Sequence, residues 1–85
     1  MELTLTRKTN SVNEYLLKEE EGFSISIYDN DNNMIWCCCS GDVTMRCIEA
    51  VGTKKLLYID ILYNGRYVGM VCNPSRIKIE PQQKL

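Results

Sequence analysis

Cysteine is the residue type in this sequence with the clearest capacity for chemistry. The chain has five cysteines and no histidine, and the lack of an imidazole excludes Ser-His-Asp and Cys-His catalysis. Zinc would need four cysteines to converge, but the sequence contains no Cys-x-x-Cys pair. We therefore interpret the cysteines as packing residues and expect no metal or other cofactor. The four that would have to meet at a metal are Cys37, Cys39, Cys47 and Cys72.

Catalysis by other side chains is also not expected. The acidic segment Asp29–Asn33 begins like a calcium loop, but Met34 stands where that loop needs glycine and Ser40 where it needs glutamate. No paired carboxylates and no glycine-rich phosphate loop occur at a usable spacing. We therefore predict that the protein is not an enzyme and that it has no catalytic residues.

Binding to a partner is the remaining chemistry that the side chains offer. The polar tip at residues 29–33 offers carboxylates, and tryptophan and tyrosine are enriched at the centres of protein interfaces. Two tyrosines flank an Asn-Gly turn with an arginine between them, a pattern that favours an aromatic and basic patch. Core packing of the single tryptophan and cross-strand pairing of the tyrosines are the alternatives. The predicted partner-binding residues are Asp29, Asp31, Trp36, Tyr63, Arg66 and Tyr67.

Strands must position most of these residues, because apolar and polar residues alternate along most of the chain. The strongest local signal is Asn64-Gly65 between two β-rich segments, which predicts a type I′ hairpin. The short turns predict antiparallel pairing, since a parallel crossover needs a longer connection. The predicted strands are Glu2–Arg7, Phe23–Tyr28, Met34–Cys39, a segment from Val43, Leu56–Tyr63, Arg66–Cys72 and Arg76–Ile79.

One segment predicts a helix instead. Ser11 and Glu14 have the spacing of a capping box, and Gly22 is a suitable residue after a helix end. We therefore predict a short helix over residues 12–20. The whole chain, residues 1–85, is then expected to be a single mainly β (α+β) domain. Its six to seven short strands would form an antiparallel meander, bent or rolled into a small barrel that the helix covers.

Two segments resemble the carbon storage regulator family, whose members are small RNA-binding dimers. Leu3–Lys8 (LTLTRK) is similar to the first strand of that family. Gly41–Thr44, with the chain through Gly52 to Ile61, is similar to its central hairpin. The resemblance implies that Arg7 contacts RNA. The family's second RNA-binding arginine would fall near Cys72, which is not basic, and this chain has extra residues between the two segments.

Two functions follow from these observations. The first is a small cytoplasmic regulatory protein that binds another protein, of the kind that phages and mobile elements encode as inhibitors. The alternative is an RNA-binding regulator that uses Arg7, Lys8, Arg66 and Arg76. Ten basic against eleven acidic residues favour the first, because nucleic-acid-binding domains usually carry a basic excess.

The remaining expectations concern location and assembly. An odd number of cysteines, three of them consecutive, indicates reduced thiols in a cytosol. No secretory signal and no apolar segment of membrane-spanning length is visible, so no membrane partner is expected. A homodimer through an edge strand is expected, because a chain of this size buries a limited share of its surface.

Overall fold

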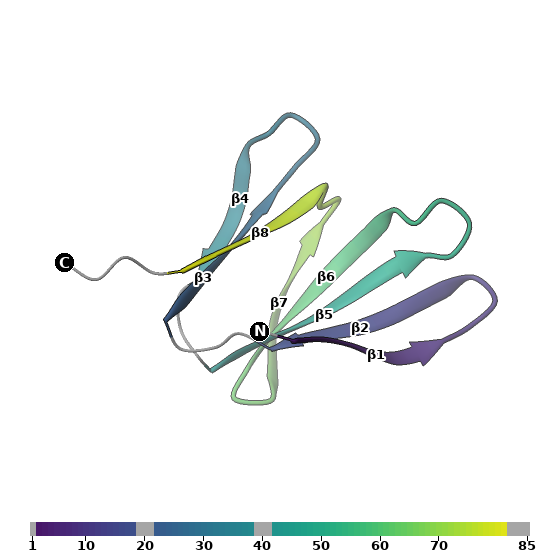
Figure 1. The fold of residues 1–85 in the computed structure, drawn as a ribbon, viewed down its shortest axis with the longest axis horizontal. Coiled ribbons are helices and arrows are strands. Elements are labelled where there is room, and N and C mark those ends of the chain that lie inside the picture. Colours follow the sequence, from purple (N-terminus) through teal and green to yellow (C-terminus); the bar gives the residue numbers. More distant parts are fainter. Residues whose placement is uncertain (1, 19–21, 39–41, 82–85) are drawn as a thin grey trace.

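The computed structural model describes residues 2–18, 22–38 and 42–81, and within them the chain forms eight antiparallel strands in two sheets (Figure 1). Sheet A has five strands in the order β1-β2-β5-β6-β7, and sheet B has three in the order β4-β3-β8. The predicted β-rich, antiparallel fold class is confirmed. The strands are β1 (Glu2–Lys8), β2 (Val12–Lys18), β3 (Phe23–Tyr28), β4 (Met34–Cys38), β5 (Val43–Ala50), β6 (Leu56–Tyr63), β7 (Arg66–Cys72) and β8 (Arg76–Pro81).

The predicted helix over residues 12–20 is wrong, since Val12–Lys18 forms β2 in the middle of sheet A. Residues 19 and 20 lie outside the described part of the chain. β2 pairs with β1 from Asn13 to Lys18 on one side and with β5 along its whole length on the other. Two ladders of hydrogen bonds together with burial of Leu17 outweigh the local capping pattern. With β2 included, the described residues form eight strands, whereas the sequence predicted six to seven.

The two sheets do not close into a barrel in the part of the chain that is described. β1 and β7 are the edges of sheet A, and β4 and β8 are the edges of sheet B. In Figure 1 sheet B stands beside the fan of five strands that forms sheet A. The core lies between the sheets, and its fully buried side chains come from both. The buried core residues are Leu17, Ile25, Ile27, Val43, Met45, Cys47, Ile59, Ile61 and Val71.

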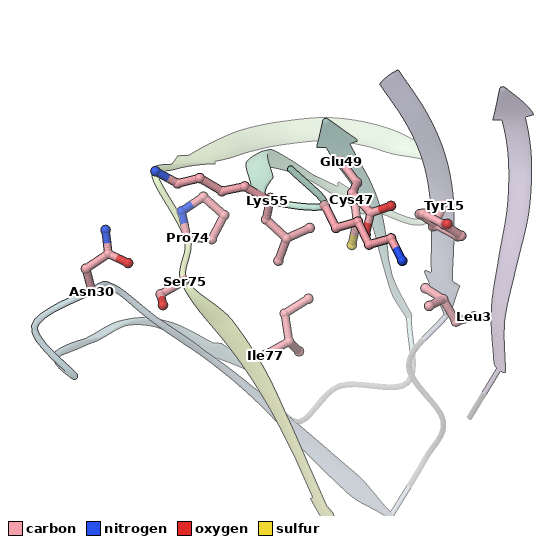
Figure 2. A pocket seen from close by; sticks show the side chains of 11 residues that line it. Leu3, Tyr15, Asn30, Cys47, Glu49, Lys55, Pro74, Ser75 and Ile77 are labelled. Atoms are coloured by element: carbon pink, nitrogen blue, oxygen red, sulfur yellow. The ribbon is translucent and has the colours of Figure 1, made fainter. Parts of the chain in front are cut away.

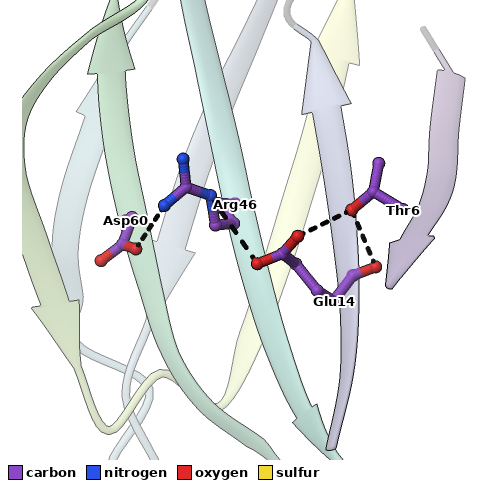
Figure 3. A network of polar contacts seen from close by, with 4 residues as sticks. All are labelled: Thr6, Glu14, Arg46 and Asp60. Carbon is purple, nitrogen blue, oxygen red and sulfur yellow. Dashed lines mark hydrogen bonds and ion pairs between the residues drawn. The ribbon is translucent and has the colours of Figure 1, made fainter. Parts of the chain in front are cut away.

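A polar network ties four strands together on the other face of sheet A (Figure 3). Arg46 on β5 donates a hydrogen bond to the Asp60 carboxylate on β6 at 3.4 Å, and its Nε lies 3.9 Å from Glu14 on β2. The Thr6 hydroxyl on β1 contacts the Glu14 carboxylate at 3.0 Å and the Glu14 carbonyl oxygen at 3.2 Å. The network explains why charged side chains occur in central strands: each has a cross-strand partner.

The predicted Asn-Gly hairpin is present between β6 and β7. Asn64 has a φ of 50° and Gly65 a φ of 80°, as a type I′ turn requires. The turn is attached to the start of β5, because the Asn64 N–H donates to the Asp42 carbonyl oxygen at 3.1 Å. The opposite end of sheet A carries the turn between β5 and β6, at residues 51–55. These two turns define the two ends of the molecule used below.

Candidate functional site

A groove opens between the edges of the two sheets, where β4 of sheet B faces β6 and β7 of sheet A. Its volume is about 370 Å³. None of the residues that line it is charged, and most are aliphatic or aromatic. We call it the β4–β7 groove. Its lining residues are Trp36, Cys38, Val43, Ile61, Tyr63, Val68, Gly69, Met70 and Val71.

Strand alternation places Trp36 in this groove. Trp36 pairs with Ile27 and Cys38 pairs with Ile25, and both isoleucines are fully buried. Paired residues share a face of the sheet, so Trp36 and Cys38 point toward sheet A and pack against the core. Trp36 is half-buried, which leaves part of the indole on the groove surface. The alternative of core packing is therefore met in part, and contact of Trp36 with a partner stays a prediction.

Tyr63 reaches the same groove from the end of β6. It pairs with buried Val43 on the face of sheet A that looks toward sheet B, and 45% of its surface is exposed. Arg66 pairs with Tyr63 across the Asn-Gly turn and is exposed. The structure thus brings Trp36 and Tyr63 to one groove, although they are distant in the sequence, and Arg66 lies beside Tyr63.

Tyr67 does not join them. It pairs with Leu62 on the opposite face of sheet A, and 61% of its surface is exposed. The pairing shifts between Ile61 and Leu62, which leaves Val68 as the extra residue of a β-bulge. Val68 is also 61% exposed and lines the groove. No pattern in the sequence predicts a groove position for Val68, because the bulge depends on how β7 pairs with β6.

Asp29 and Asp31 lie at the tip of the β3–β4 hairpin, away from the groove's tyrosine. Asp29 Oδ1 accepts hydrogen bonds from the backbone N–H groups of Asp31 and Asn33, both at 2.9 Å. The Asn33 N–H, followed by that of Asp31, lowers the pKa of Asp29 below its usual value. This carboxylate therefore holds the turn, while Asp31 is exposed. No cluster of three or more metal-binding side chains occurs in the described part of the chain.

The four basic residues of the RNA-binding alternative lie at different places. Arg7 lies at the end of sheet A that carries the 51–55 turn, because the pairing across β2, β5 and β6 puts it level with Cys72. Lys8 is the next residue of β1. Arg66 lies at the other end, beside the Asn-Gly turn. Arg76 belongs to sheet B, where its guanidinium stacks on Tyr28 at 4.0 Å and donates to Asn32 Oδ1 at 2.6 Å. The structure therefore gives these residues no common face.

The cysteines occupy contrasting environments. Cys47 is 3% exposed, and burial raises the pKa of its thiol to about 11, so it remains a neutral packing group. Cys37 on β4 and Cys72 on β7 are both exposed. Cys39 lies outside the described residues, so the structure describes three of the four candidate zinc ligands. Cys37 and Cys38 point to opposite faces of β4, because they pair with consecutive residues of β3.

Comparisons with known proteins add no family. No model of a known protein family matches the chain, and searches of curated proteins and of solved structures find no significant similarity. Of the two segments that resemble the carbon storage regulator family, Leu3–Lys8 lies on β1, and the described part of the second lies on β5, β6 and the turn between them. In the described residues, no helix has the length and apolar character needed to cross a membrane.

Proposed function

We propose that this chain is a non-enzymatic regulatory protein that binds another protein through the β4–β7 groove. One observation carries the proposal: Trp36 and Tyr63, from strands of different sheets, meet in an uncharged groove of about 370 Å³. Exposed apolar side chains with aromatic anchors are typical of protein interfaces. Trp36 is supported by the core on one side, so it is held rigidly and loses little side-chain freedom on binding.

The proposed occupant is an extended segment of the partner that presents aliphatic or aromatic side chains. β4 and β7, which border the groove, are both edge strands, and an edge strand can pair with an added strand. The uncharged lining disfavours a charged segment, because a charge would lose its hydration there without gaining a partner. Exposed Arg66 beside Tyr63 favours an acidic residue at the end of that segment.

The cellular setting is part of the same proposal. We propose a cytoplasmic protein, because exposed Cys37 and Cys72 would be prone to oxidation in a secreted one. A role as an inhibitor of phage or mobile-element origin agrees with a small protein that carries an apolar groove suited to binding a partner. RNA binding is not favoured, because its four basic residues do not share a face.

The experiment is affinity capture from a native lysate with three forms of the tagged protein. Val68→Glu puts a charge into the groove at a position that is 61% exposed, so the fold tolerates it. Leu57→Glu is the matched control, since Leu57 is 41% exposed and does not line the groove. We expect a stoichiometric protein that the wild type and Leu57→Glu retain and that Val68→Glu loses at least tenfold.

Nuclease treatment separates the two functions. The captured protein should remain after nuclease, because protein binding needs no RNA bridge. Loss of the partner with nuclease, equal capture by Val68→Glu, or the absence of any stoichiometric protein would each contradict the proposal.

A further inference from the structure

A second cavity lies at the other open side of the molecule, between β1 of sheet A and β8 of sheet B. Its volume is about 450 Å³, which is within the range of small-molecule sites. We call it the β1–β8 cavity. Figure 2 shows Leu3 and Tyr15 on one side of it, Pro74 on the other side, and Ile77 between them. None of these residues belongs to the β4–β7 groove.

The floor of the cavity is apolar and rigid. Ile77 pairs with fully buried Ile27, so it points toward sheet A, and Pro74 is itself fully buried. Tyr15 pairs with Cys47, which is 3% exposed. On the β1 side of the cavity, Leu3 is 58% exposed. Sheet B is narrower than sheet A and leaves this apolar side chain uncovered.

The mouth of the cavity is cationic. Lys54 and Lys55 both line it, and their backbone is fixed by the turn between β5 and β6. The Lys54 N–H donates to the Ala50 carbonyl oxygen at 2.8 Å, and the Ala50 N–H donates to the Lys55 carbonyl oxygen at 2.9 Å. Among the described residues neither ammonium group forms an ion pair. Two positive charges thus lie at an apolar cavity, and residues 2–18, 22–38 and 42–81 supply no ion-pair partner for them.

Glu49 is the only acidic residue among those that line the cavity. Its Oε1 accepts a hydrogen bond from the Asn13 amide at 3.5 Å. The lining therefore carries two positive charges and one negative charge. The net positive charge favours an anion, and the apolar floor favours a hydrocarbon or aromatic body.

We propose that the β1–β8 cavity binds an amphiphilic anion. The apolar body lies between Leu3 and Ile77, and the anionic headgroup, a carboxylate, sulfonate or phosphate, pairs with Lys54 and Lys55. Charge complementarity favours an anion, because a neutral ligand would supply no counter-charge to the two ammonium groups. This site shares no lining residue with the β4–β7 groove, so each proposal can be tested without the other.

The test uses two fluorescent probes that differ by one charge. The first is 8-anilinonaphthalene-1-sulfonate, and the second is N-phenyl-1-naphthylamine, which has the same rings without the sulfonate. In the double variant Lys54→Gln/Lys55→Gln we expect the dissociation constant of the sulfonate to rise about fivefold, as for solvent-accessible ion pairs. The affinity for the neutral probe should not change, which also shows that the cavity is still folded.

Two further variants fix the sign and the place of the effect. Glu49→Gln removes the negative charge of the lining and should tighten sulfonate binding about twofold. Lys78→Gln is the charge control, because Lys78 pairs with Glu80 at 3.0 Å outside the cavity, and it should change the affinity by less than a factor of two. Decanoate should displace the sulfonate, as a carboxylate with an apolar chain.

Three outcomes would overturn the proposal. One is sulfonate affinity that Lys54→Gln/Lys55→Gln leaves unchanged. Another is an equal loss of affinity for both probes, which would assign the lysines a structural role. The third is loss of the sulfonate signal in Val68→Glu, which would place the probe in the β4–β7 groove. Methyl resonances of Leu3 and Ile77 should shift on titration, and those of Val68 should not.

Discussion

Asp29 shows how one carboxylate can be committed to structure rather than to binding. It accepts the N–H groups of Asp31 and Asn33, and these hydrogen bonds lower its pKa from the usual 3.8. A lowered folded-state pKa means that the ionised form stabilises the fold. This contribution is complete above pH 3.8 and is lost as the pH falls through the folded-state pKa.

Replacing this carboxylate tests the assignment. Asp29→Ala should lower the free energy of unfolding at neutral pH, and the difference from the wild type should shrink as the pH falls below 3.8. Urea denaturation at several pH values measures it. Asp31→Ala is the matched control, because only the backbone N–H of Asp31 takes part in the turn. A difference for Asp29→Ala that stays constant with pH would contradict the assigned role of the charge.

The groove residues show how far single residues could be predicted. Trp36 and Tyr63 were predicted as contact residues from their type alone, and the structure places both in one groove. Tyr67 was predicted to lie with Tyr63, but the two-residue turn pairs Tyr63 with Arg66 and Leu62 with Tyr67, so strand alternation puts Tyr67 on the other face. The β-bulge at Val68 was not predicted, because no pattern in the sequence marks where an extra residue interrupts the pairing of β6 with β7.

At the scale of elements, the turn between β6 and β7 depends on one glycine. Gly65 has a φ of 80°, and an added Cβ would meet no atom within 4 Å. Gly65→Ala should therefore cost about 1 kcal/mol for backbone strain alone. Gly52→Ala is the control, because Gly52 has no positive φ and equal space around it, and it should change stability by less than about 0.5 kcal/mol. Thermal unfolding of both variants measures the difference, and equal costs would be inconsistent with strain.

The elements that could be predicted are those that local residues determine. Asn64-Gly65 identified its hairpin, since both residues need a positive φ that few other residues adopt. The segment after Ser11 was predicted as a helix, although Val12–Lys18 forms a strand that pairs with a neighbour on each side. Glu14 was read as half of a capping box, but it contacts Thr6 and Arg46 on neighbouring strands. Partners that are distant in the sequence outweigh such local patterns.

At the scale of the whole molecule, the shared core makes the two sheets depend on each other. Ile27 of sheet B and Ile59 of sheet A are both fully buried in the same cluster. Ile27→Val and Ile59→Val should each destabilise the protein by about 1 kcal/mol, which lowers the melting temperature by about 4–8 °C. In each variant the fluorescence of Trp36 and the far-ultraviolet circular dichroism should change at the same temperature. An earlier fluorescence change would mean that sheet B unfolds separately.

The pairing of β3 with β8 also bears on how the chain folds during synthesis. Ile25 pairs with Ile79, so the last described strand completes the sheet that the third strand begins. In sheet A, β5, β6 and β7 pair in the order in which they leave the ribosome, whereas β2 must wait for β5. Until β8 emerges, Ile25 and Ile27 have one neighbouring strand fewer than in the finished sheet. Such long-range pairing slows folding, so sheet B can be completed only after β5, β6 and β7 of sheet A have been translated.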